Sequence, residues 1–175
     1  DMLLVATDAD RTPIRNAYLT TLLSNAFSDS YAAMLPHTLS VRVDAVTGNE
    51  RTRKTSLTVV LVPDGKAGPE QMPFPFYITQ NEVAFGAMRT FRDGAAADLR
   101  KDPSLKRYFT GAVSIRELRG NDQPYVVSNP SEAFEFCNWL SCRQGFHPVY
   151  SRKTGSDEWA TDSAADGFRL PTEAE

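Results

Sequence analysis

The hydrophobic residues of this chain change spacing several times, and each change predicts a different kind of element. Residues 2–6 form a short apolar strand, polar residues 8–12 interrupt the pattern, and residues 13–35 place apolar side chains at helical spacing. Residues 39–45 then alternate apolar and polar positions. A β-branched run at 56–63 follows the turn Thr47-Gly48-Asn49, which predicts a β-hairpin.

The second half of the chain mixes short strands with two helices. Residues 76–78 predict a strand, and residues 82–91 predict a helix with one apolar side. Residues 92–123 are charged and poorly patterned, so we expect loops there, with a short strand near 112–115. A further helix should begin at Asn129, which is a favourable N-cap followed by Pro130, and should end at Gly145. Residues 147–167 predict a loop or hairpin.

The final residues carry a helix start signal. Thr172 and Glu175 have the spacing of a capping box, in which each side chain bonds the backbone of the other residue. A single nucleated turn has no stability of its own. We therefore expect the polypeptide to continue past Glu175.

Composition narrows the class of protein without indicating a function. The 175 residues are 41% hydrophobic and 23% charged, and the formal net charge is −3. No apolar run approaches the roughly 20 residues that span a bilayer, so no membrane span is predicted. Basic and acidic residues are interspersed, which argues against a nucleic-acid partner. Cys137 and Cys142 fall in one predicted helix about 8–9 Å apart, beyond the reach of a disulfide.

The last nine residues, Gly-Phe-Arg-Leu-Pro-Thr-Glu-Ala-Glu at 167–175, resemble the most recognisable stretch of the formylglycine-generating enzyme family, the sulfatase-modifying factor domain. Residues 133–141 are similar to the helix of that family that carries a cysteine and a tryptophan. The order of further matching positions agrees across residues 57–175: the strand at 76–78, the helix at 82–91, Pro148-Val149-Tyr150, Trp159 and Ala165.

The resemblance implies an α+β, C-type-lectin-like fold that is incomplete here. Residues 57–175 would form the front portion of the domain, and residues 1–56 would form an N-terminal αβ extension. Two departures from the family pattern stand out. Ala84 replaces a Thr that caps the first helix, and Ser128-Asn129-Pro130 replaces the usual Val-Ser-Trp entry to the second.

In the oxidase members of the family, the catalytic cysteine pair, the copper site and the calcium ligands follow the Arg-Leu-Pro-Thr-Glu-Ala-Glu stretch. The resemblance therefore assigns no catalytic, cofactor-binding or metal-binding residue to this chain, and copper or calcium would belong to the missing half. Cys137 lies on the apolar side of its helix and is predicted to be a buried structural thiol. The two histidines, His37 and His147, lack the nearby Cys or His companions of a metal site.

Two functions remain open, and with them whether the protein is an enzyme. The first is a scaffold or recognition module that binds a protein or peptide, its fold completed by the continuing polypeptide or by a second chain. The second is an oxidase that converts a cysteine of a substrate protein to formylglycine, or a related iron-dependent sulfoxide-forming enzyme.

Binding residues are expected on the loops at 92–123 and 147–166, because loops carry function in folds of this kind. Tyr77, Trp139, Trp159 and Phe168 are also predicted to lie in the core. The candidate binding surface consists of Arg92, Arg116, Arg119, His147, Tyr150 and Trp159.

Overall fold

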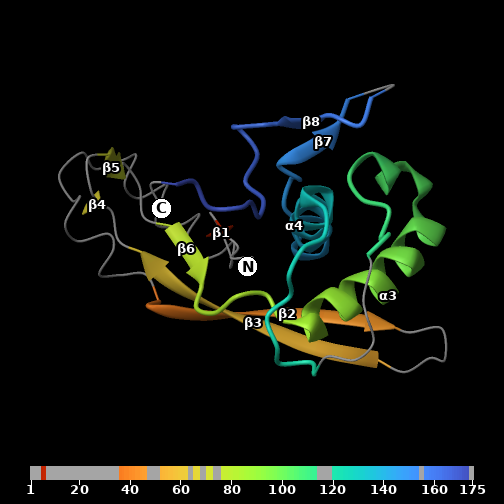
Figure 1. Ribbon diagram of the computed structural model, residues 1–175, viewed down its shortest axis with the longest axis horizontal. Helices are drawn as coiled ribbons and strands as arrows, with labels where there is room; N and C mark the ends of the chain where they lie inside the picture. The colour runs from red at the N-terminus through yellow and green to blue at the C-terminus, as the bar shows by residue number, and fades with distance from the viewer. Residues whose placement is uncertain are drawn as a thin grey trace.

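The computed structural model describes residues 5–6, 36–46, 52–62, 65–67, 70–72, 76–113, 120–153 and 156–173. The described elements mix helices with small antiparallel sheets, so the predicted α+β class is confirmed (Figure 1). The strands are β1 (Val5–Ala6), β2 (Thr38–Val46), β3 (Thr52–Val62), β4 (Gly65–Ala67), β5 (Glu70–Met72), β6 (Phe76–Thr79), β7 (Tyr150–Arg152) and β8 (Trp159–Thr161). The helices are α3 (Phe85–Lys101), the short 3-10 helix η2 (Pro103–Arg107) and α4 (Pro130–Gln144).

The largest sheet is antiparallel and has four strands in the order β1-β6-β3-β2. The predicted hairpin is confirmed: β2 and β3 pair along their length, with Val41 opposite Leu57. Alternation of apolar and polar residues gives this hairpin one buried face and one polar face. Val41, Val43 and Val59 are almost completely buried beneath α3.

Helix α3 is longer than predicted, and the expectation of loops from residue 92 was wrong as far as Lys101. The helix continues past residue 91 with a buried side made of the small residues Gly94 and Ala95. Because these residues are small, this side of α3 packs closely against its neighbours. A Cβ atom on Gly94 would lie 2.6 Å from the ring of Trp139, so only glycine lets α4 approach this closely. Residues 112 and 113 are not in a strand, and the rest of the strand predicted there lies outside the described residues.

The start of α3 is capped by backbone rather than by a side chain. Ala84 makes no capping bond, as expected from its replacement of Thr. The amides of Phe85 and Gly86 instead donate to the carbonyl oxygens of Gln123 and Asn121, at 2.9 and 2.8 Å. The orphan amides of the first turn are thus satisfied by a distant loop.

Helix α4 begins and ends as predicted. The Asn129 side chain accepts a bond from the amide of Ser131, Pro130 occupies the first turn, and Gly145 ends the helix at φ 75°. Cys137, Trp139 and Leu140 are fully buried, and Trp139 packs against the ring of Phe91 of α3. Helix α4 lies between the four-stranded sheet and the β7–β8 hairpin (Figure 1).

The residues after β8 return to α4. Phe168 is fully buried, and its amide donates to the hydroxyl of Ser141 at 2.8 Å. A side chain on Gly167 would collide with the carbonyl of His147 and with Ser141. Tyr77, Trp139 and Phe168 are therefore core residues, as predicted.

Some of the sequence predictions fall partly or wholly outside the described residues. The helix at 13–35 lies outside them, and so does Glu175, the second residue of the capping box. The domain boundary between residues 56 and 57 falls inside β3 and stays a prediction. Within the described parts, no helix combines the length and apolarity that crossing a bilayer requires.

Candidate functional site

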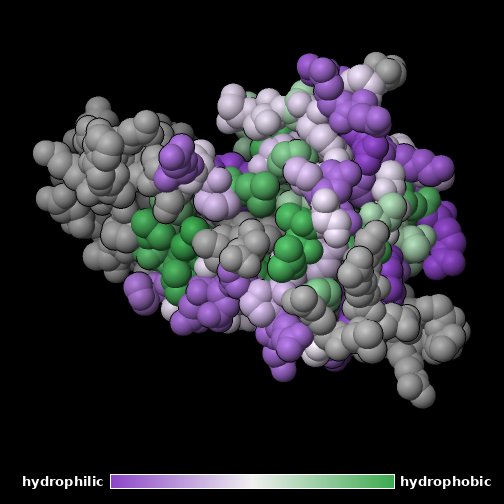
Figure 2. All heavy atoms as spheres, viewed as in Figure 1, coloured by the Kyte–Doolittle hydropathy of each residue, from purple (hydrophilic) through white to green (hydrophobic). Residues whose placement is uncertain are grey.

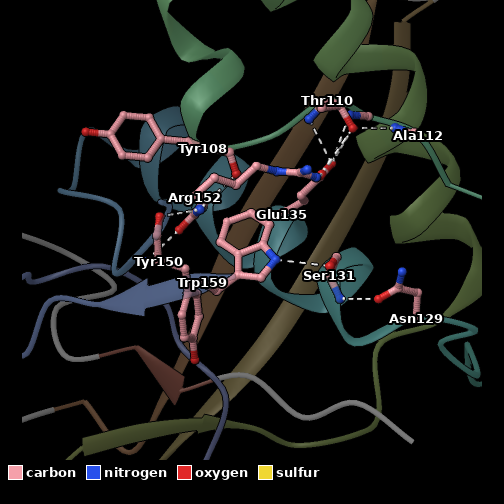
Figure 3. Close-up of polar contacts among 11 residues, drawn as sticks. Tyr108, Thr110, Ala112, Asn129, Ser131, Glu135, Tyr150, Arg152 and Trp159 are labelled. Atoms are coloured by element: carbon pink, nitrogen blue, oxygen red, sulfur yellow. Dashed lines mark hydrogen bonds and ion pairs between the residues drawn. The ribbon is translucent and has the colours of Figure 1, made fainter. Parts of the chain in front are cut away.

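The buried carboxylate of Glu135 in α4 lies at the centre of a polar cluster that it forms with Thr110, Gly111 and Arg152 (Figure 3). Its side chain is only 4% exposed, and it bonds Arg152 at 2.5 Å. It also accepts the amides of Thr110 and Gly111, at 2.7 and 3.1 Å, and the hydroxyl of Thr110 at 2.9 Å. Gly111 has φ 72°, a conformation that glycine adopts without strain. The charge of Glu135 is thus compensated by one cation and three neutral donors.

Arg152 and Trp159 join the β7–β8 hairpin to this cluster. They are directly opposite each other on the two strands, and the guanidinium lies 5.0 Å from the centre of a Trp159 ring. The indole N–H of Trp159 donates to the hydroxyl of Ser131 at 3.0 Å, in the first turn of α4. The Nε of Arg152 is buried and has no hydrogen-bond partner among the described residues. Figure 3 shows the Arg152 side chain extending past Trp159 toward Glu135.

Asn138 fixes β7 against α4. Its side-chain oxygen accepts the amide of Tyr150 at 3.0 Å, and its side-chain nitrogen donates to the Tyr150 carbonyl at 2.7 Å. The same nitrogen donates to the carbonyl of Tyr108 at 2.9 Å. A fully buried asparagine thus takes the place of a neighbouring strand along β7.

A cavity of about 460 Å³ adjoins the cluster, between the start of α4, the turn at 110–112 and the β7–β8 hairpin. Glu132 lies in its wall and accepts the hydroxyl of Tyr125 at 2.7 Å and the amide of Ser128 at 3.2 Å. Burial, together with the hydrogen bond to Glu132, raises the pKa of Tyr125 well above its usual range. The lining is mostly polar and includes Thr110, Ser128, Asn129, Glu132, Arg152 and Asp157.

A second cavity, of about 590 Å³, lies where β3 and β6 meet the start of α3. Hydroxyl, amide and carboxylate side chains line it, including Thr79, Gln80, Asn81, Glu82 and Asp122. It contains none of the residues predicted to bind a ligand.

The predicted binding residues do not gather in one place. The rings of Tyr150 and Trp159 both pack against Phe134 of α4. Tyr150 is buried, and its hydroxyl accepts the amide of Leu170 at 2.9 Å. His147 is exposed on the loop after α4, where its Nδ1 lies 3.1 Å from Asp166. Arg92 lies in α3 and forms an ion pair with Asp93. Arg116 and Arg119 lie outside the described residues. Ligand binding by any of the six stays a prediction.

Sequence reasoning missed the residues that build the cluster, above all Glu135, Arg152 and Asn138. Glu135 stands between Phe134 and Phe136 in a helix that is otherwise apolar there, and this was the one available signal. A buried acidic side chain requires a basic residue or hydrogen-bond donors to compensate its charge. The sequence alone does not show which one.

The two cysteines are free thiols without activation. Cys137 is fully buried, and this burial raises the pKa of its thiol, so the prediction of a buried structural thiol is confirmed. Burial, reinforced by the charge of Asp98, raises the pKa of Cys142 to about 11. Among the described residues, no three His, Cys, Asp or Glu side chains are placed together to hold a metal ion.

No protein-family model, no curated protein and no solved structure matches this chain. The resemblance to the formylglycine-generating enzyme family therefore stays a prediction.

Proposed function

We propose that this chain is the front portion of a formylglycine-generating-enzyme-type, C-type-lectin-like domain that serves to recognise a protein or peptide. The blocks that carry the resemblance pack against one another. Phe168 bonds Ser141 of α4, and Leu170 bonds the hydroxyl of Tyr150. Contacts among these blocks are what a shared family core requires, and they support the proposal.

The observation that carries the recognition function is the polar cavity beside Glu135. Its walls come from α4, the turn at 110–112 and the hairpin, and hydrogen bonds to Glu135, Asn138 and Ser131 join these three segments. A site whose walls are fixed before binding loses less conformational entropy when a ligand arrives. Polar groups that converge on a preformed hollow are typical of a binding site.

The thiol chemistry favours recognition over catalysis by these cysteines. A thiol reacts as its thiolate, and a raised pKa keeps Cys137 and Cys142 protonated at neutral pH. The copper and calcium implied by the resemblance would be bound by residues outside this chain.

The cavity can be tested by filling it. Ala112 is exposed and lines the cavity, so Ala112→Trp should block it, whereas Ala96→Trp places the same side chain on the exposed side of α3. Peptides would be selected from a random phage-displayed library on the unaltered protein. Their affinities for both variants would then be measured by isothermal titration calorimetry. We expect a loss of binding with Ala112→Trp only, and equal affinities for both variants would contradict the proposal.

A second assay addresses oxidase activity. The natural full-length protein would be incubated with copper and a cysteine-bearing sulfatase peptide, and the peptide thiol would be counted over time. A recognition module leaves the thiol intact. Catalytic loss of the thiol would replace the recognition proposal with the oxidase.

A further inference from the structure

The hydrogen bonds of the β7–β8 hairpin determine which backbone groups point outward. At one end the amide of Lys153 donates to the Glu158 carbonyl at 2.9 Å, and at the other the amide of Asp162 donates to the Val149 carbonyl at 2.8 Å. Bonded and non-bonded pairs alternate in an antiparallel ladder. With the observed register, the pair of Arg152 and Trp159 and the pair of Tyr150 and Thr161 are non-bonded. Their amides and carbonyls therefore point away from the partner strand.

The outer edges of β7 and β8 differ in whether their backbone groups are hydrogen-bonded. Along β7, both outward groups of Tyr150 are bonded by the Asn138 side chain. Along β8, the outward amides and carbonyls of Trp159 and Thr161 have no partner within the described part of the chain. Trp159 is half-buried and Thr161 is exposed. The edge of β8 thus offers four backbone groups at the spacing of a strand.

Acidic residues flank this edge. Residues 156–163 contain three carboxylates, Asp157, Glu158 and Asp162, and no basic residue. Lys153 compensates Glu158 at 2.7 Å, while the Asp162 carboxylate bonds the neutral amide of Ala164 at 2.9 Å and forms no ion pair within the described residues. Figure 2 shows hydrophilic side chains gathered over the hairpin at the top of the molecule. The local charge favours a basic partner.

We propose that the outer edge of β8 binds an extended basic segment of a partner protein by strand addition. The proposal goes beyond the recognition function of the cavity, because it adds a second contact surface whose edge residues, Trp159 and Thr161, do not line that cavity. Main-chain bonds to Trp159 and Thr161 would give affinity, and Lys or Arg side chains near Asp157 and Asp162 would give selectivity. An unpaired edge accepts such a segment without any rearrangement of the hairpin.

The probe is the peptide acetyl-Lys-Val-Lys-Val-Lys-amide, with acetyl-Glu-Val-Glu-Val-Glu-amide as its control for charge. Two further versions of the Lys peptide carry N-methyl groups, one on the odd residues and one on the even residues. Only one of these two sets points toward β8, because outward groups alternate along a strand. Binding would be measured by isothermal titration calorimetry. We expect one methylated peptide to bind about tenfold or more weakly and the other to bind normally. The Glu peptide should not bind.

The protein arm compares Thr161→Pro with Thr161→Val. Proline removes the outward amide of Thr161, which the hairpin does not use, whereas valine keeps it. Thermal unfolding would verify that both variants are folded, and the methylated peptides test the same bonds on the unaltered protein. Binding of the Lys peptide should be lost with proline, retained with valine and retained with Ala112→Trp.

Other outcomes separate this proposal from the recognition function. Equal binding of both methylated peptides would overturn strand addition. Absence of Lys-peptide binding would also overturn it, and in that case cavity binding by the library peptides would leave the recognition function standing. If library peptides and the Lys peptide both fail to bind, both proposals are wrong.

Discussion

Replacing Glu135 with Gln tests the cluster that positions the cavity walls. Gln has the same shape, but it carries no charge and one of its two terminal atoms is a donor. It therefore removes the counter-ion of Arg152. The amides of Thr110 and Gly111 bond the same carboxylate oxygen, so a Gln that keeps them turns its NH2 group toward the Arg152 guanidinium, which loses its acceptor. The change should destabilise the fold without creating a cavity.

The magnitude follows from burial. Breaking a buried ion pair costs about 3–5 kcal/mol, and leaving a buried donor unsatisfied costs about 1–3 kcal/mol. The Arg152 side chain is 32% exposed, so water recovers part of the loss. We expect a decrease of about 3 kcal/mol in the free energy of unfolding, or a Tm lower by about 6–12 °C for a chain of this size.

The matched control is Glu158→Gln, which removes another carboxylate that bonds a basic residue. Glu158 and Lys153 are 70% and 55% exposed, and such surface pairs contribute about 0–1 kcal/mol. Both variants would be compared by urea unfolding monitored by far-UV circular dichroism. If Glu135→Gln costs no more than Glu158→Gln, the cluster does not hold these segments together.

Further perturbations probe the core and the thiols. Trp139→Ala should lower the free energy of unfolding by about 3–5 kcal/mol and abolish the sharp thermal transition of the 76–175 region. Trp159→Ala changes a half-buried residue and should lower the free energy of unfolding by less. Scanning calorimetry of the two variants measures the difference. Gly167→Ala should lower Tm because its Cβ has no room, and an unchanged Tm would show that the loop yields freely. The pKa of Cys142 is raised to about 11 in the folded protein, whereas an unperturbed thiol has a pKa of about 8.5. As pH rises, the thiol therefore ionises in the unfolded chain before it ionises in the folded protein. The stability that this group contributes is complete below about pH 8.5 and is lost as pH rises toward 11. Iodoacetamide at pH 7.5 should label neither Cys137 nor Cys142 in the folded protein and both in urea, as read by intact mass.

Elements governed by local chemistry were predictable from the sequence. Helix α4 has its N-cap at Asn129 and its left-handed glycine at Gly145, and both signals act within one turn. The β2–β3 hairpin followed from alternation at 39–45, a turn signal at 47–49 and a β-branched run at 56–63. The second half of α3 was missed because the stripe of Gly94 and Ala95 is small and flanked by charges, and its burial depends on Trp139 of another helix.

The polar cluster could not be predicted for the same physical reason. Glu135 meets Arg152 and Thr110, which are 17 and 25 residues away in the chain. Such contacts depend on how α4 packs against the hairpin and the turn, and no local pattern encodes them. Ligand binding by Tyr150 and Trp159 stays a prediction, and no signal in the sequence indicated that the Tyr150 backbone joins β7 to α4 through Asn138.

Amide hydrogen exchange of the outward groups of β8 tests recognition by this face most directly. Without a ligand, the amides of Trp159 and Thr161 should exchange rapidly, while the Asp162 amide, which bonds Val149, should be protected. Addition of acetyl-Lys-Val-Lys-Val-Lys-amide should slow the exchange of Trp159 and Thr161 and leave that of Asp162 unchanged. Saturating peptide that leaves both outward amides exchanging at their original rates would show that recognition does not take place along this strand.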